Sequence, residues 1–263
     1  MSGPARLPEP LAALLGDRDL TPITIGRSSS STAWAIGEGH RWVVKVQPID
    51  ELDTSLAGEA ERMAWLAPFV SVPAVVATGS DGDLEWLVTE ALSGSDATDA
   101  AHGHNAVSLV RLLGQGLRQL HDQVPVNGCP FDASTDTDLD RARQRLEAGR
   151  VDEADFEGLH RGLSAAKLYE LMLASRPVDR DDLVVLHGDY CVPNVIVDQG
   201  TVSGYVDLGR CGVGDRHRDL AIGARSIARN FGGDAVGLFM DAYGLDAPRL
   251  ARLDFFAMLD EFF

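Results

Sequence analysis

The sequence predicts a mixed α/β (α+β) protein with a small N-terminal lobe built on an antiparallel sheet and a larger, mainly helical C-terminal lobe. The chain has 263 residues, which is more than a single hydrophobic core usually organises. Strand-like alternation of apolar residues dominates the first third, and helical periodicity dominates most of the rest. We place the boundary near residue 92, so that the two lobes comprise residues 1–92 and 93–263.

The N-terminal lobe is expected to contain strands at residues 42–46 and 84–89. In the first strand, alternation places Val43 and Lys45 on one face and their sequence neighbours on the other. The second strand follows an Asp-Gly turn. Between the two strands, apolar residues at near-helical spacing predict a helix from about residue 51 to residue 66.

The C-terminal lobe is expected to begin with an amphipathic helix, because apolar residues recur at helical spacing from Val110 to Leu120. Short strands are predicted at residues 183–186, 195–197 and 202–206. The last two flank Gln199-Gly200, a pair of residues typical of a hairpin turn.

The formal net charge of −17 argues against nucleic acid and anionic membrane as partners and favours a cationic small molecule, although acidity can also serve solubility alone. The three cysteines are far apart and lack the spacing of zinc sites, so we expect thiols in a reducing cytosol. No apolar stretch approaches the roughly 20 residues that a membrane span requires. We therefore expect a cytoplasmic protein, as a monomer or weak dimer.

The segment from His187 to Asn194, followed after the hairpin by Asp207, contains the most informative pattern of polar residues. If the hairpin strands pair across the turn, Asn194 and Asp207 emerge at the same end. Amide and carboxylate oxygens are ligands that Mg²⁺ prefers. Asp189 lies in a loop after a strand, where its carboxylate is left to accept a proton from a hydroxyl. This ordered set predicts phosphoryl transfer.

Lys45 is a candidate for binding nucleotide phosphates, paired with Glu59 of the predicted helix as in protein-kinase folds. The alternative is a solvated surface ion pair. The loop with Ser28, Ser29 and Ser30 could cover the phosphates with backbone N–H groups and hydroxyls, although serine runs are often ordinary loops. The glycine-rich fingerprints of P-loop and Rossmann folds are absent from the sequence.

These segments together resemble the aminoglycoside 3'-phosphotransferases. The resemblance extends from Lys45 almost to the chain end, and it is most specific at residues 187–194, 207–216 and 259–263. It implies a protein-kinase-like fold and a reaction that uses ATP and Mg²⁺ to phosphorylate the 3'-hydroxyl of an aminoglycoside such as kanamycin or neomycin. The implied biological outcome is antibiotic resistance.

The resemblance also implies roles for individual residues. Asp189 matches the catalytic aspartate, Asn194 and Asp207 match the magnesium ligands, and Lys45 matches the phosphate-binding lysine. The nucleotide would further contact Glu59, Val43, Thr89, Ala91 and the serine loop. The cationic acceptor would be bound by Asp155, Glu157, Arg210, Arg225, Asp260, Glu261 and the carboxylate of Phe263.

Several alternatives remain open. Asp155 and Glu157 could equally lie on a solvated helix face. Ser226 stands where some relatives have an acidic residue, so the substrate range could differ. A kinase for choline, homoserine or a macrolide would use the same scaffold. A nucleotide-binding module without catalysis is the alternative from a different class.

Overall fold

The computed structural model describes residues 7–23, 30–37, 39–50, 52, 54–102, 106–245 and 249–263. The chain divides into two compact units. The first comprises Met1–Ser93 and Gly204–Gly209, and the second comprises Gly94–Ser203 and Arg210–Phe263. Among the residues described, no helix is both long enough and apolar enough to cross a membrane.

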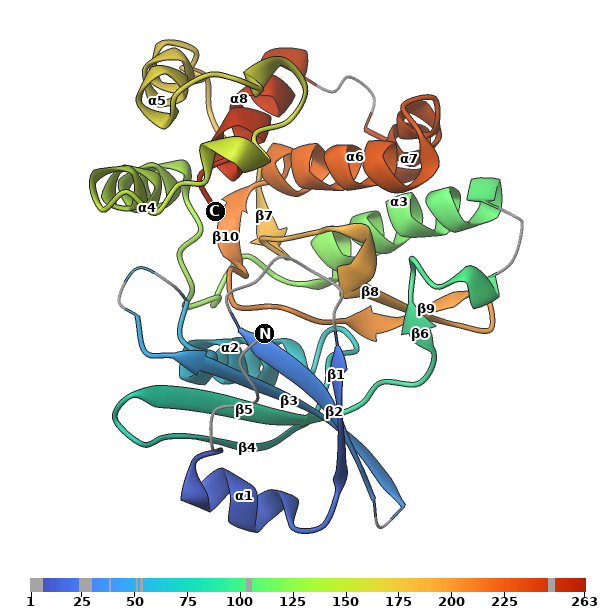
Figure 1. Cartoon of the computed structure of the whole chain (residues 1–263). Helices are drawn as coiled ribbons and strands as arrows, with labels where there is room; N and C mark the ends of the chain where they lie inside the picture. The colour runs from blue at the N-terminus through green and yellow to red at the C-terminus, as the bar shows by residue number, and fades with distance from the viewer. Residues whose placement is uncertain are drawn as a thin grey trace. The chain divides into compact units, whose positions relative to one another are not determined.

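The first unit is built on a five-stranded antiparallel sheet in the order β1-β2-β3-β5-β4 (Figure 1). The strands are β1 (Asp19–Ile23), β2 (Ser31–Gly37), β3 (His40–Pro48), β4 (Val75–Ser80) and β5 (Leu84–Glu90). The predictions of strands at residues 42–46 and 84–89 are therefore confirmed. The helices of this unit are α1 (Glu9–Leu15) and α2 (Leu56–Leu66).

The predicted alternation along β3 is also confirmed. Trp42 and Val44 are buried against Leu11 and Leu15 of α1, so this face of the sheet forms an apolar core. Lys45 lies on the opposite face, where it meets Glu59 of α2. The two helices therefore cover opposite faces of the sheet.

Helix α2 is shorter than the sequence pattern predicted, because it begins at Leu56 and not near residue 51. Ser55 has an extended backbone, and its hydroxyl accepts a hydrogen bond from the N–H of Gly58 at 3.0 Å. This is an N-cap, which satisfies a helical N–H that has no partner within the helix. The cap sets the start of the helix, and apolar spacing alone could not locate it.

The second unit is mainly helical. Its helices are α3 (Ala106–Gln123), α4 (Thr135–Glu147), α5 (Ala165–Ala174), α6 (His217–Phe231), α7 (Ala235–Tyr243) and α8 (Leu250–Asp260). Single turns of 3₁₀ helix lie at η1 (Ala100–His102), η2 (Glu153–Asp155), η3 (Gly158–His160) and η4 (Val192–Asn194). The predicted helix with Val110 and Leu120 is confirmed as α3, and both side chains are buried.

Short strands complete this part of the chain. They are β6 (Ser95–Asp96), β7 (Leu183–Leu186), β8 (Val195–Asp198), β9 (Thr201–Tyr205) and β10 (Gly212–Asp215). Strand β7 pairs with β10, and β8 lies between β6 and β9. The predicted strands and hairpin turn are confirmed: Gln199 and Gly200 both have positive φ, 48° and 78°, as type I′ turns require.

The C-terminal residues are part of the core of the second unit. Phe255, Phe256, Leu259 and Phe262 are each at most 2% exposed and pack with Phe156. The backbone carbonyl of Phe262 also accepts a hydrogen bond from the Nε of Arg145 at 2.7 Å. These last residues are therefore held in place by packing and by a hydrogen bond.

Candidate active site

In the first unit, the ammonium group of Lys45 is held by two carboxylates. Its Nζ donates to Glu59 Oε1 and Oε2 at 2.8 and 3.0 Å, and to Asp207 Oδ1 at 3.0 Å. The side chains of Lys45 and Glu59 are only 16% and 4% exposed, so this is not a solvated surface pair. Burial alone would lower the pKa of Lys45, but Asp207 and Glu59 raise it above its ordinary value. The lysine therefore remains a cation.

Asp207 has an unusual backbone conformation, with φ of 61° in the left-handed region. A residue with a side chain adopts this region at a cost, and such positions cluster at functional sites. The next residue contributes to the same arrangement, because the N–H of Leu208 donates to Glu59 Oε1 at 3.3 Å. Glu59 thus binds both the lysine and the backbone beside Asp207.

The other predicted nucleotide residues of this unit that the structure describes lie on β3 and β5, directly after β5, or directly before β2. Val43 pairs directly with Thr89 across the two strands, so both lie on the sheet face of Lys45. Ala91 follows β5, and its N–H donates to the Arg41 carbonyl at 2.9 Å. Ser30 is a partly buried residue immediately before β2. The predictions for Ser28 and Ser29 lie outside the described residues.

In the second unit, a buried carboxylate on α6 holds the loop that follows β7. Asp219, which is 0% exposed, accepts the N–H of His187 at 2.7 Å and that of Gly188 at 2.9 Å. Gly188 has φ of 88°, and a Cβ there would lie 2.1 Å from the carbonyl oxygen of Arg210. Only glycine fits at this position. The loop therefore leaves β7 in one defined direction.

Asp189, the predicted catalytic residue, is fixed by its own loop. Asn194 Nδ2 donates to Asp189 Oδ2 at 3.0 Å and to its backbone carbonyl at 2.9 Å. The thiol of Cys191 donates to Asp189 Oδ1 at 3.2 Å. Because the amide nitrogen of Asn194 points to Asp189, its carbonyl oxygen Oδ1 is the atom suited to bind a cation. Asn194 lies in the second unit and Asp207 in the first.

Ser226 on α6 is a residue whose role the sequence analysis missed. Its hydroxyl, 3% exposed, accepts the N–H of Val192 at 2.9 Å. Val192 opens η4, the turn that ends at Asn194. Ser226 lies seven residues after Asp219, so both point from the same face of α6 toward the loop. This helical spacing is the signal that could have identified the pair.

The predicted acceptor residues at the chain end form a network of ion pairs. Arg225 Nη1 lies 2.7 Å from Asp260 Oδ2, and Arg225 Nη2 lies 3.1 Å from Glu261 Oε2. Glu261 Oε1 also accepts the N–H of Glu157 at 3.1 Å and lies 2.9 Å from His160 Nδ1. At 4% side-chain exposure, Glu261 is bound mainly by protein groups.

Asp260 is electrostatically linked to Asp189 in the loop after β7. Burial raises the pKa of Asp260, opposed by Arg225 and Arg210 and reinforced by the negative charge of Asp189. Arg210 Nη2 lies 3.8 Å from Asp260 Oδ1, and the Arg210 guanidinium lies 4.3 Å from the centre of the Phe263 ring. Asp155 is exposed on η2. The structure thus brings most of the predicted acceptor residues of this unit together.

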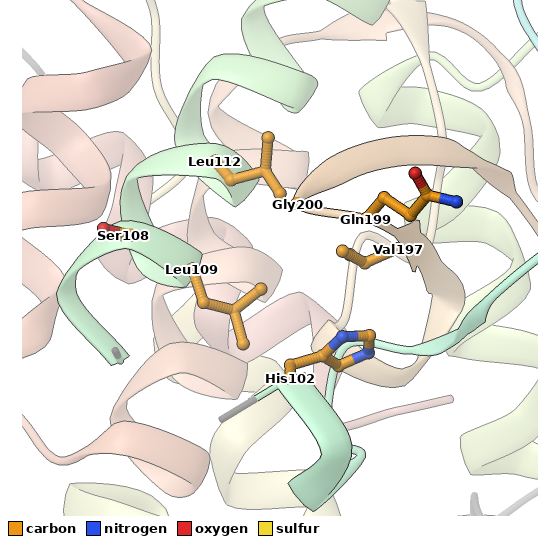
Figure 2. Close-up of a pocket in the computed structure, with 7 residues that line it drawn as sticks. All are labelled: His102, Ser108, Leu109, Leu112, Val197, Gln199 and Gly200. Carbon is orange, nitrogen blue, oxygen red and sulfur yellow. The ribbon is translucent and has the colours of Figure 1, made fainter. Parts of the chain in front are cut away.

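Two other features of the described residues concern a metal cluster and a cavity. In the described part of the chain, no group of three or more His, Cys, Asp or Glu side chains is arranged to hold a metal. A cavity of about 270 Å³ lies in the second unit. Figure 2 shows that Leu109 of α3, His102 of η1 and Val197 of β8 face it. None of the predicted site residues lines it.

The chain matches the phosphotransferase enzyme family over residues 19–256. It is 35% identical to an aminoglycoside 3'-phosphotransferase of Niallia circulans, with 97% of each chain covered. It is 32% identical to a streptomycin 3''-kinase of Streptomyces griseus, covering 92% of this chain and 91% of that protein.

A solved structure gives the same result at the level of the fold. The crystal structure of an aminoglycoside-3'-phosphotransferase of type VIII superposes with a TM-score of 0.85 at 34% identity. The match covers 96% of this chain and 97% of that chain. This agreement confirms the α/β, protein-kinase-like fold class expected from the sequence.

Proposed function

This chain belongs to the phosphotransferase enzyme family, and we propose that it transfers the γ-phosphoryl group of ATP to the 3'-hydroxyl of aminoglycoside antibiotics. The observation that carries the proposal is the loop after β7, in which Asn194 holds the carboxylate of Asp189 and Asp219 holds the backbone before it. A carboxylate fixed in this way orients the attacking hydroxyl and accepts its proton. We expect the reaction in the cytoplasm, where ATP is available, and resistance to the drug as its outcome.

For the nucleotide, Lys45 would bind phosphate oxygens. Glu59 holds its ammonium group at the sheet face and, together with Asp207, keeps it charged. The transition state of phosphoryl transfer is loose, so a fixed cation beside the phosphates contributes through position and charge. The remaining nucleotide contacts that we propose are Val43, Thr89, Ala91, Ser28, Ser29 and Ser30.

For magnesium, the donor set fits a hard cation, because Asn194 offers an amide oxygen and Asp207 a carboxylate. We propose that these two residues hold it. Bound Mg²⁺ would neutralise negative charge on the phosphate oxygens during transfer. The hydrogen bonds from Asn194 to Asp189 would then keep the base and the metal ligand in a constant arrangement.

For the acceptor, the carboxylates at the chain end would bind ammonium groups. Asp260 and the terminal carboxylate of Phe263 are the proposed central ligands, with Glu157, Glu261 and Asp155 around them and with Arg210 and Arg225 positioning the carboxylates. Charge-assisted hydrogen bonds of this kind contribute more than neutral ones. The net charge of −17 would also attract a polycationic drug over a longer range.

One relative supports a second candidate acceptor. The streptomycin 3''-kinase of Streptomyces griseus is nearly as similar to this chain as the 3'-phosphotransferase and matches it over 92% of its length. Streptomycin is also a cationic aminosugar. Phosphorylation of its 3''-hydroxyl is therefore the alternative reaction to be tested.

The deciding experiment is mass spectrometry of kanamycin, neomycin, streptomycin and tobramycin after incubation with the enzyme, ATP and Mg²⁺. We expect a gain of one phosphate on kanamycin and neomycin, with the phosphate located at the 3'-oxygen by NMR. Tobramycin lacks the 3'-hydroxyl and serves as the matched control. Phosphorylation of tobramycin, or of streptomycin alone, would reject the 3'-assignment.

A variant enzyme tests the catalytic residue separately. We expect Asp189→Asn to retain nucleotide binding and to lose most phosphoryl transfer, since Asn194 and Cys191 can still bond to the amide while the proton acceptor is gone. Nucleotide binding is measured by calorimetry and transfer by product mass. Transfer near the parent rate would exclude Asp189 as the base.

A further inference from the structure

Glu157 in the second unit lies between two arginines that are one turn apart on α6. Arg225 and Arg229 are separated by four residues, so they share one face of the helix. Arg229 Nη2 lies 2.5 Å from Glu157 Oε1, and Arg225 Nη2 lies 3.6 Å from Glu157 Oε2. Each oxygen of this carboxylate therefore has an arginine beside it.

The two arginines differ in how firmly they are held. Arg225 is 20% exposed and is also bonded to Asp260, Glu261 and the carbonyl of Ala257. Arg229 is 48% exposed, and its pair with Glu157 lies toward solvent. An exposed ion pair of a long side chain contributes little free energy, because water screens it and ordering the side chain costs entropy. Arg229 is therefore the partner that another cation can displace.

Glu157, by contrast, is anchored. Its N–H donates to Glu261 Oε1, and its backbone carbonyl accepts the N–H of His160 at 3.0 Å at the start of the 3₁₀ turn η3. Its side chain is 29% exposed, so one side of the carboxylate can be reached from solvent. A fixed and accessible carboxylate suits an ammonium group, but in this chain the guanidinium of Arg229 already occupies the place of that ammonium group.

We infer that Arg229 is a selectivity residue that competes with the ammonium groups of the acceptor for Glu157. The inference rests on the proposed function and deepens it by naming the acceptor class that the site disfavours. A drug amine that approaches Glu157 must displace Arg229 and then remain near a like charge. Arg229 therefore reduces the preference for aminoglycosides with an additional amine, which is selectivity through repulsion.

The test compares kanamycin A with kanamycin B, which has an amine in place of one hydroxyl. We expect Arg229→Gln to lower the KM for kanamycin B by about fivefold, the effect of an exposed ion pair, and to lower that for kanamycin A less. The KM for ATP should not change. Arg229→Lys keeps the positive charge, so its KM for each kanamycin should stay close to that of the parent enzyme.

Two controls make the result specific. Arg143 on α4 is 49% exposed and lies near Asp140 and Glu147, so Arg143→Gln changes net charge equally at a matched surface site. This variant should leave the KM for kanamycin A and the KM for kanamycin B unchanged. In the Glu157→Gln background, Arg229→Gln should lose its effect, as a double-mutant cycle requires when two residues act through one contact.

The outcomes separate this inference from the proposed function. Phosphorylation of either kanamycin by the parent enzyme supports the function whatever Arg229→Gln does. An unchanged or raised kanamycin KM in Arg229→Gln, an equal effect of Arg143→Gln, or an effect that persists without Glu157 would overturn the inference alone. Failure of the parent enzyme to bind either kanamycin in calorimetry would overturn both.

Discussion

The buried hydroxyl of Ser226 connects helix α6 to the turn that contains Asn194. We expect Ser226→Ala to lower the free energy of unfolding by about 1–3 kcal/mol, because the N–H of Val192 is left buried without a partner. The kcat should fall more than the KM for either substrate changes, since Asn194 positions Asp189. Urea unfolding and steady-state kinetics measure both effects. Ser80→Ala, at an exposed site, is the control and should change neither.

The buried pair of Lys45 and Glu59 allows a prediction about the free energy of unfolding of a single-residue variant. Lys45→Met leaves Glu59 buried without its cation, which we expect to cost about 3–5 kcal/mol at neutral pH. Burial raises the pKa of an unpaired Glu59, so the folded variant takes up a proton more readily than the unfolded chain.

The stability loss of this variant should therefore shrink as pH falls from about 8 to about 5.5. Urea unfolding at both pH values measures it. The double variant Lys45→Met/Glu59→Leu removes the buried charge altogether and should show no such recovery. A loss for Lys45→Met that is equal at both pH values would mean that Glu59 is not desolvated as described.

At the scale of an element, the N-cap of α2 helps to position Glu59 in the first turn of that helix. Ser55→Ala removes the side-chain bond to the N–H of Gly58, which typically costs about 1 kcal/mol. Because Glu59 lies in the first turn of α2, we expect the ATP KM to rise while the aminoglycoside KM stays unchanged. Ser55→Asp restores a capping oxygen and should restore the ATP KM. A normal ATP KM in Ser55→Ala would indicate that sheet packing alone holds the helix.

For the whole molecule, two opposing effects determine how stability depends on pH. The net charge of −17 at pH 7 diminishes toward the isoelectric point near 4.7, so repulsion between acidic groups should decrease on acidification. Asp219 acts in the opposite direction. Burial alone would raise its pKa, but the hydrogen bond from His121 and nearby positive charges lower it. Asp215 likewise has a lowered pKa, where burial is outweighed by His217.

A carboxyl with a lowered folded-state pKa contributes stability above its unfolded value, and that contribution is lost as pH falls through the folded pKa. We therefore expect the urea midpoint to rise modestly between pH 7 and about 5 and to fall below about pH 4, near the ordinary aspartate pKa. Asp215→Asn should be less stable at neutral pH and show a shallower acid decline. An identical acid decline in the variant would exclude Asp215 as a contributor.

The strands and helices were predictable where the signal is local. Alternation along β3 and helical spacing along α3 show which side chains lie on the face of each element that packs against the core. The beginning of α2 was not predictable from apolar spacing, because a single hydrogen bond from Ser55 sets it. The hydrophobic pattern thus identified the elements. It did not locate the start of α2, because a capping hydroxyl is not part of that pattern.

The sequence by itself determined the family, the order of elements and the residue types available for chemistry, including Lys45 and the segment from His187 to Asn194. Only the tertiary structure decided which of those residues bond to one another. Ser226 meets a backbone N–H 34 positions earlier, and Arg229 meets Glu157 at a separation of 72. Local propensity acts over a few residues, whereas such pairs form only when packing brings distant elements together. For that reason the burial of Glu261 and the competition at Glu157 follow from the fold and not from any motif.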